Sequence, residues 1–124
     1  MLQSILIVGV GGFFGSIFRY LMTHYVNTSA QSIFPWGTLF VNLLGSFFIG
    51  IIIASVISEN LSQPYRLLLA TGFCGGFTTF SSFSYEFFSL LQHEHTGYAF
   101  LYAIGSFGLG LLLVWLGFTL GKAI

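Results

Sequence analysis

Long apolar runs dominate this chain and restrict what it can fold into. Four of them cover residues 2–22, 37–57, 65–91 and 98–120. A helix needs about 20 apolar residues to cross a hydrocarbon core about 30 Å thick, and each run has that length. The sequence therefore predicts an all-α membrane protein with four transmembrane helices, folded as a single membrane domain over residues 1–124.

Composition and the segments between the runs agree with this class. Hydrophobic residues make up 56% of the chain and charged residues 5%, whereas soluble domains carry about a quarter charged residues. The formal net charge is zero, so no basic surface predicts a nucleic-acid partner. The first run lacks a basic leader and a small-residue cleavage pattern, and we interpret it as a retained span rather than a signal peptide. The connecting segments are too short to hold a soluble domain.

The residues that enzymes and metal clusters use are sparse. Cys74 is the single cysteine, which excludes an intramolecular disulfide and a cysteine metal cluster. His24, His93 and His95 lie near the ends of runs and form no catalytic set with a serine and an aspartate. The last two are most simply solvated loop residues. An enzyme is therefore the least expected class.

The third run is interrupted where a membrane helix should be continuous. Residues 72–83 read GFCGGFTTFSSF, and irregular backbone at membrane depth is tolerated only inside protein or beside a watery cavity. Pro64 suits a helix start, so we expect one half-helix to follow it and stop at Gly75-Gly76, and a second to begin at Phe80. The carbonyls between the halves would lose their helical partners and could hold a monovalent cation such as Na⁺, as broken transporter helices do. A glycine-kinked helix whose hydroxyls bond back to the preceding turn is an equal alternative.

Polar and aromatic side chains at helical spacing predict a path for a small anion. Phenylalanines at positions 73, 77, 80, 83 and 87 would share one helical face, and aromatic ring edges, such as those of Phe80 and Phe83, are electropositive. Asn42 adds two amide donors. The polar residues at steps of four on the second and fourth runs are Thr38, Asn42, Ser46, Tyr102 and Ser106. Lipid contact, core packing and hydrogen bonds between helices are the alternative explanations.

Two charged residues lie within the runs. Arg19, late in the first run, could extend to the membrane interface or line a basin that gathers anions. Glu86 is an intramembrane carboxylate, which makes it a functional candidate by default. Next to an anion path, we expect this carboxyl group to be protonated, mobile or hydrogen-bonded.

The cations of the chain predict no fixed orientation in the membrane. Arg66 and Lys122 fall on the side of the amino terminus and Arg19 on the other, which is a weak bias under the positive-inside rule. Such chains can insert both ways and pair about an axis in the membrane plane; one fixed orientation is the alternative. Small residues at helix-packing spacing predict close helix contacts, about half of them between subunits. The pairs are Gly11 with Gly15, Gly12 with Ser16, Ser46 with Gly50 and Ala54, Ser106 with Gly110, and Gly117 with Gly121.

Three segments of the chain resemble the signature segments of the bacterial fluoride channel family, Fluc or CrcB. They read GGFFGSIFRY at residues 11–20, GTLFVNLLGSF at 37–47 and GFCGGFTTFSSF at 72–83. The resemblance implies a fluoride-selective channel of the bacterial inner (plasma) membrane that lets F⁻ leave the cytoplasm passively. It also implies an antiparallel, dual-topology homodimer in membrane lipid, with two fluoride pores, the third helix broken at mid-membrane, a central structural Na⁺ and no organic cofactor.

The resemblance also implies roles for single residues. Gly75 and Thr78 would bind Na⁺ through their backbone carbonyls, and Arg19 would lie at the aqueous vestibule. The fluoride pathway would contain Asn42, Phe80, Phe83, Tyr102 and Ser106, with Thr38, Ser82 and Glu86 near one end of the pore. Gly110 departs from the family pattern, which often has a hydroxyl one turn after Ser106.

Two other classes of membrane protein compete with a channel. A small multidrug-type exporter also uses four short helices and dual topology, but it would carry a glutamate in the first span, and this span has no carboxylate. A non-conducting structural membrane subunit would need no polar track, and replacing Asn42 in it would affect assembly only.

Overall fold

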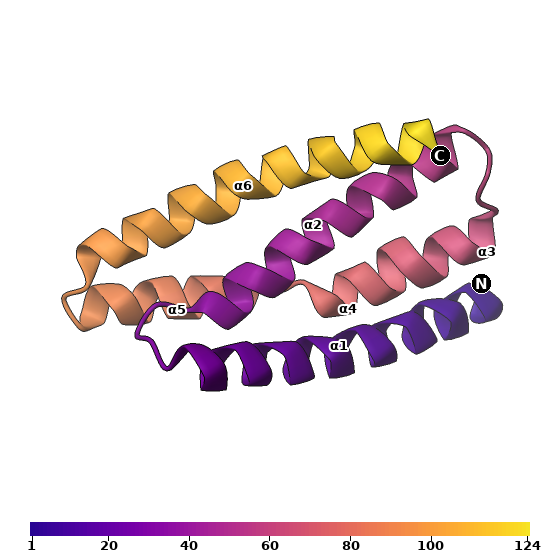
Figure 1. Ribbon diagram of the computed structural model, residues 1–124. Coiled ribbons are helices and arrows are strands. Elements are labelled where there is room, and N and C mark those ends of the chain that lie inside the picture. Colours follow the sequence, from indigo (N-terminus) through magenta and orange to yellow (C-terminus); the bar gives the residue numbers. More distant parts are fainter.

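The computed structural model describes residues 1–124, and all its regular elements are helical. Three helices are continuous: α1 (Leu2–Ala30), α2 (Trp36–Ile57) and α6 (Thr96–Ala123). The segment between α2 and α6 consists of α3 (Gln63–Arg66), the π-helical segment η1 (Leu67–Cys74), α4 (Gly75–Phe77) and α5 (Phe80–Gln92). These pieces run along the length of the molecule, and both termini lie at the same end (Figure 1). The prediction of an all-α protein is confirmed.

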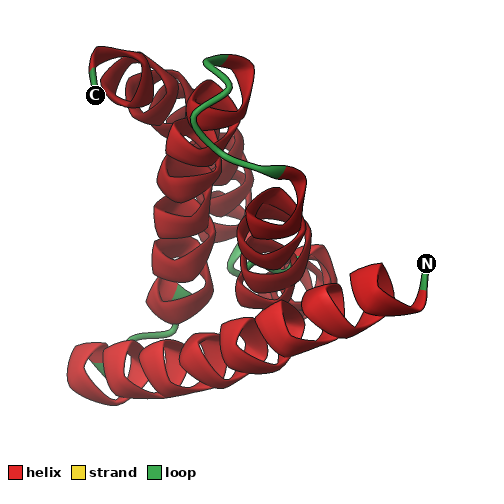
Figure 2. Cartoon of the chain, turned by 90° about the vertical axis from the view of Figure 1, so that its right-hand side faces the viewer, coloured by secondary structure: helices red, strands yellow, loops and turns green.

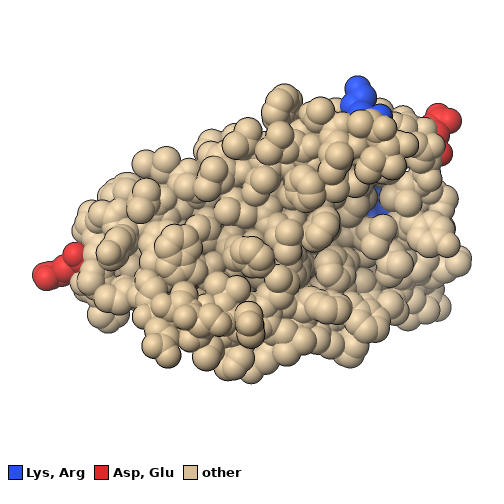
Figure 3. Space-filling model, in the orientation of Figure 1, with Lys and Arg blue, Asp and Glu red and all other residues tan.

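The three continuous helices are long and apolar enough to cross a membrane. The mean hydropathy of the most apolar stretch is 1.8 in α1, 2.4 in α2 and 2.0 in α6. On the face shown in Figure 3, charged atoms appear only toward the two ends, with uncharged surface between them. The chain is therefore a multi-pass membrane protein. A fourth span built from α3 to α5, and the pairing of two antiparallel copies, stay predictions.

The first helix continues past the end of its apolar run. α1 ends at Ala30, so the predicted polar loop begins later than expected. The hydroxyl of Thr28 donates a hydrogen bond of 2.7 Å to the carbonyl of His24, which keeps this polar residue within the helix. Gln31 then ends α1 in the left-handed conformation, with φ 45°. An apolar run sets the length that lipid can cover, whereas the helix itself can extend beyond the hydrocarbon.

Small residues bring helices of this one chain together. α1 packs against η1, and α2 packs against α6; in the end view of Figure 2, these two pairs lie on opposite sides of the molecule. A methyl group on Gly11 would lie 2.9 Å from the Cα atom of Gly72, and one on Gly121 would lie 2.8 Å from the Cβ atom of Ala54. These glycines therefore pack within the chain, and they are not free for contacts between subunits. The glycines with open space around them are Gly9, Gly75, Gly97, Gly105 and Gly108.

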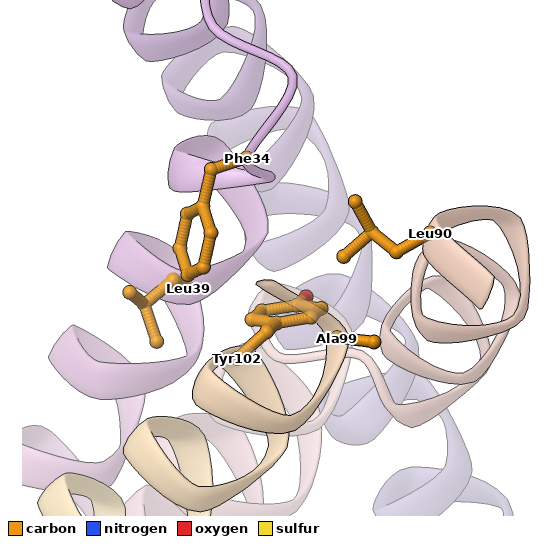
Figure 4. Close-up of a cluster of buried hydrophobic side chains, with 5 residues drawn as sticks. All are labelled: Phe34, Leu39, Leu90, Ala99 and Tyr102. Atoms are coloured by element: carbon orange, nitrogen blue, oxygen red, sulfur yellow. The ribbon is translucent and has the colours of Figure 1, made fainter. Parts of the chain in front are cut away.

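The largest buried cluster lies where the start of α2, the end of α5 and the start of α6 meet (Figure 4). It consists of Phe34, Leu39, Leu90, Ala99 and Tyr102. Phe83 and Phe87 pack against it from α5. The cluster fixes α5 against α2 and α6, and the polar groups of these three helices are thereby held in one place.

Candidate functional site

The helix break lies at Thr78 and Thr79. α4 ends at Phe77, and the two threonines have extended backbone, with φ −90° and ψ 156° for Thr78 and φ −149° and ψ 122° for Thr79. The prediction that the second half begins at Phe80 is confirmed. The predicted stop at Gly75-Gly76 is slightly early, because the helix includes both glycines and ends one residue later, at Phe77. Two extended residues also exclude the alternative of a merely kinked helix.

Close packing explains why the glycines do not end the first half-helix. A methyl group on Gly76 would lie 2.7 Å from the carbonyl oxygen of Gly12 on α1. Gly76 is therefore small because α1 approaches it, and it keeps ordinary helical geometry. The π-helical segment η1 directly precedes this part of the chain. Widened helical turns of this kind are frequent near functional sites.

The break divides the predicted phenylalanine stripe into two groups. Phe77 is buried, and its ring stacks on Phe73, with 5.6 Å between the ring centroids. Beyond the break, the rings of Phe80 and Phe83 lie 5.9 Å apart. Phe80 is 78% exposed in the single chain. The prediction of one continuous helical face is therefore wrong, since the extended residues turn the second group away from the first.

Thr79 begins the second half-helix as its N-cap. Its hydroxyl oxygen accepts a hydrogen bond of 3.2 Å from the backbone N–H of Ser82, which is the usual role of threonine at this position. The hydroxyl of Ser82 lies 3.3 Å from the same oxygen. Ser82 therefore belongs to the start of α5 and forms no hydrogen bond with Glu86. Sequence reasoning missed Thr79 as a site residue, although a threonine directly before the predicted helix start at Phe80 was a signal for it.

The side chain of Asn42 on α2 bonds to both backbone groups of Thr79. Its Oδ1 atom accepts a hydrogen bond of 2.8 Å from the Thr79 N–H, and its Nδ2 atom donates one of 3.1 Å to the Thr79 carbonyl. One N–H of the Asn42 amide remains uncommitted. Asn42 was predicted as an anion-facing donor, and the structure places it directly on the break.

Arg19 also bonds to the broken segment, from α1. Its Nε atom donates a hydrogen bond of 3.0 Å to the carbonyl of Gly76. Arg19 is half-buried, and this contact holds its side chain against the interior of the molecule. The vestibule role predicted for Arg19 stays a prediction.

Carbonyl groups at the break are left without helical partners. The Thr79 N–H, which would bond to the Gly75 carbonyl in a continuous helix, bonds to Asn42 instead. No backbone N–H bonds to the Thr78 carbonyl. No group of three or more histidine, cysteine or acidic side chains is placed to hold a metal ion. The donor set at the break is therefore made of neutral oxygens, which suit a hard cation of low charge.

A groove of about 510 Å³ runs past the break and collects six of the predicted site residues. They are Asn42, Gly75, Thr78, Phe80, Phe83 and Ser106. The hydroxyl oxygen of Ser106 is buried and has no hydrogen-bond partner in the chain. No lysine, arginine or acidic residue lines the groove. The site thus offers hydroxyl and amide groups together with aromatic rings, without a fixed charge.

Glu86 is held by two hydroxyl groups from neighbouring helices. Thr38 on α2 donates a hydrogen bond of 2.5 Å to Oε1, and Tyr102 on α6 donates one of 3.0 Å to Oε2. Both donors are buried. The ring of Phe83 lies 4.9 Å from that of Tyr102, so this group adjoins the groove. Glu86 also lines a second hollow of about 400 Å³.

Comparison with known proteins identifies the family. A family model described as "CrcB-like protein, Camphor Resistance (CrcB)" matches residues 6–118. A "Fluoride-specific ion channel FluC" of Thermus thermophilus is 51% identical over 98% of this chain and 96% of its own length. Proteins with the same name from Leptospira interrogans and Rhizobium meliloti are 45% and 42% identical, over 92% and 99% of this chain and 94% and 99% of their own lengths.

The chain belongs to the CrcB family. The match covers the segments whose resemblance to that family the sequence shows. The names of these relatives describe channels rather than enzymes, which agrees with the prediction that this chain is not an enzyme.

Proposed function

We propose that this chain forms a fluoride-selective channel through which F⁻ leaves the cytoplasm passively, which relieves fluoride toxicity. The observation that carries the proposal is the groove shared by Asn42, Phe80, Phe83 and Ser106. It offers hydrogen-bond donors and ring edges, and it has no cationic side chain that would trap an anion. The names of the relatives support fluoride as the ion.

The donors of the groove match what fluoride requires. Fluoride is small and strongly hydrated, and moving a bare ion into a medium of low dielectric costs roughly tens of kcal/mol in an idealised estimate. Hydroxyl and amide groups must therefore replace its water. Ser106 has an unpartnered buried hydroxyl, and Asn42 has one uncommitted N–H. Chloride is larger, and it would gain less from such donors in a narrow path.

The path would continue from the groove to the group around Glu86. The ring of Phe83 packs on that of Tyr102, whose hydroxyl bonds to Glu86. Beyond Glu86 lies the second hollow, which would open toward the membrane surface. Two hydroxyls hold this carboxyl group in place, as expected for a hydrogen-bonded carboxyl group next to an anion path. A methyl group added to Gly110 would lie 3.6 Å from Ser46 Oγ, and in place of the hydroxyl that the family often has there, this position would be left to water.

The proposed functional unit is an antiparallel, dual-topology homodimer in the bacterial inner (plasma) membrane. In it, α3 to α5 form the fourth span, and the break lies at mid-membrane. Phe80 is largely exposed and Gly75 has open space beside it in the single chain, so a second copy could cover this side and close the groove. Two copies related by an axis in the membrane plane would have two equivalent pores.

A structural Na⁺ would lie at the centre of this dimer. Its ligands would be the carbonyls of Gly75 and Thr78, two of the groups left without helical partners. Two oxygens from one chain give an incomplete set, and a second copy would double it. When bound, the ion supplies a fixed positive field beside the pores, while the chain's own residues provide its cradle.

Fluoride efflux from liposomes tests the proposal. Liposomes with the purified protein should release fluoride and retain chloride. Ser106→Ala should lower the efflux, because it removes a donor from the groove. Ser55→Ala is the matched control, since its hydroxyl bonds to the Ile51 carbonyl of its own helix at 3.1 Å and it does not line the groove. Equal release of chloride, or no release of fluoride, would contradict the proposed function.

A further inference from the structure

We propose that Asn42 is a positioning residue that holds the helix break in shape and so keeps the cation-binding carbonyls free. This role is distinct from donating a hydrogen bond to the anion. The claim about cation binding rests on the proposed function. The claim about the shape of the break rests only on the contacts between Asn42 and Thr79.

The amide of Asn42 supplies the hydrogen-bond partners that the backbone of Thr79 would have in a regular helix. It accepts from the Thr79 N–H at 2.8 Å and donates to the Thr79 carbonyl at 3.1 Å. Only one orientation of the amide fits, because the reverse would place its NH₂ group against the Thr79 N–H. A buried peptide group left without partners is costly. One side chain on α2 thus makes an extended residue between two half-helices stable.

Neighbouring helices hold some peptide groups of the break and leave others free. Asn42 on α2 binds both groups of Thr79, and Arg19 on α1 binds the carbonyl of Gly76 at 3.0 Å. The carbonyls of Gly75 and Thr78 have no such partner. The two carbonyls that the proposed function gives to Na⁺ are therefore among those that the chain leaves free.

Asn42 also prevents the break from closing. Without its Oδ1 atom, the Thr79 N–H would be free to bond to the Gly75 carbonyl four residues earlier, as in a continuous α-helix. That bond would occupy one of the free carbonyls. The side chain of Asn42 therefore competes with the Gly75 carbonyl for the Thr79 N–H. Removing this side chain should reduce cation binding even though Asn42 is not a cation ligand.

Two measurements on the purified, full-length protein test this role. The first is the set of backbone carbon chemical shifts of Thr78 and Thr79, which report extended or helical conformation. The second is the Na⁺ concentration that gives half-maximal protection of the protein against heat. Asn42→Leu keeps similar volume and removes both hydrogen bonds. It should move the shifts of both threonines away from extended values and raise the required Na⁺ concentration about tenfold or more, as expected for two lost hydrogen bonds.

Two further variants separate this role from a direct action on the anion. Asn42→Asp keeps the acceptor for the Thr79 N–H and removes the donor, so its effect on the shifts should be smaller than that of Asn42→Leu. Ser106→Ala removes an unpartnered hydroxyl from the same groove and should leave both measurements unchanged, even where it lowers fluoride efflux.

The outcomes distinguish this inference from the proposed function. If Asn42→Leu lowers fluoride efflux but leaves the threonine shifts and the Na⁺ concentration unchanged, Asn42 acts on the anion alone and the positioning role is wrong. If Na⁺ has no effect on the unaltered protein, the cation part of the inference is wrong. If the unaltered protein passes no fluoride, the proposed function fails, while the shifts of Thr78 and Thr79 still decide whether Asn42 holds the break.

Discussion

The hydroxyl of Tyr102 on α6 donates a hydrogen bond of 3.0 Å to the carboxyl group of Glu86 on α5. Tyr102 is completely buried, so its hydroxyl has no access to water and depends on this partner. The other oxygen of Glu86 is bonded by Thr38 of α2. Three helices therefore meet at one carboxyl group, which belongs to the second half of the broken segment.

Tyr102→Phe should destabilise the protein and lower fluoride efflux. The variant leaves the ring in place and removes one donor from Glu86, which costs about 1–3 kcal/mol of unfolding free energy. Tyr98→Phe is the matched control, because Tyr98 is about half exposed and its hydroxyl makes no hydrogen bond within the chain. Denaturant unfolding in detergent and liposome efflux measure the two effects. Equal stability of the two variants would show that the Tyr102 hydroxyl does not support the helix junction.

Gly11→Ala should destabilise the single chain, whereas Gly9→Ala on the same helix should not. An added methyl group on Gly11 would lie 2.9 Å from the backbone of Gly72, but one on Gly9 meets no atom within 4 Å. Overpacking of this kind costs about 1–3 kcal/mol, while alanine is the better helix former at an open position. Thermal unfolding of the purified variants makes the comparison. A similar loss at both positions would mean that Gly9 packs against a second copy.

The helical architecture can be predicted from the sequence, because lipid limits which backbone conformations can cross a membrane. Apolar runs near 20 residues long can be interpreted from length alone, and α2 begins and ends within a residue of its predicted range. α1 extends further, because polar residues such as Thr28 continue a helix where lipid ends. Hydropathy predicts the apolar part of a membrane helix better than its true ends.

The exact position of the break could not be predicted, because it depends on contacts between distant residues. Gly75-Gly76 is the stronger local signal, yet α1 packs on Gly76 and the helix continues. Thr78 and Thr79 carry a weaker signal, but Asn42, distant in sequence, bonds to the Thr79 backbone. Similarly, the pairing of Thr38 and Tyr102 with Glu86 requires the packing of three helices. The residue types of the site were predictable, whereas their partners were not.

Cysteine labelling tests the dual topology. A cysteine added at the amino terminus, in a chain whose own Cys74 is buried and replaced by alanine, should react with impermeant reagents from both sides of the membrane in about equal amounts. The weak cation bias is the reason for this expectation. An added cysteine after Ile124 should give the same result, since both termini lie at one end of the molecule (Figure 1). Labelling of either terminus from one side only would mean a single orientation.

Removal of Na⁺ should weaken both the dimer and the fluoride flux. Replacing Na⁺ completely by a large organic cation takes away the ion that the Gly75 and Thr78 carbonyls would hold, and these oxygens would then face one another without a positive partner. Size-exclusion chromatography and liposome efflux, each with and without Na⁺, measure the two effects. Thr78→Ser, which keeps the carbonyl and the hydroxyl bonded to Cys74 at 2.9 Å, should retain the Na⁺ response. Unchanged dimer and flux after exhaustive replacement would rule out a structural Na⁺.

Phe80→Ile should cause a large loss of fluoride flux in a protein that still folds and dimerises. Phe80 is 78% exposed in the single chain and lines the groove, so isoleucine removes the electropositive ring edge with little loss of packing. Phe83→Ile should also lower the flux, but it removes the ring that packs on Tyr102 and is expected to lower stability as well. Phe13→Ile on α1, also exposed and outside the groove, is the matched control. In a linked dimer, one Phe80→Ile subunit should remove only part of the flux, because the proposed dimer would have two separate pores. Full flux through both Phe80→Ile and Phe83→Ile, in preparations shown to be dimeric, would show that these rings contribute to packing and not to conduction.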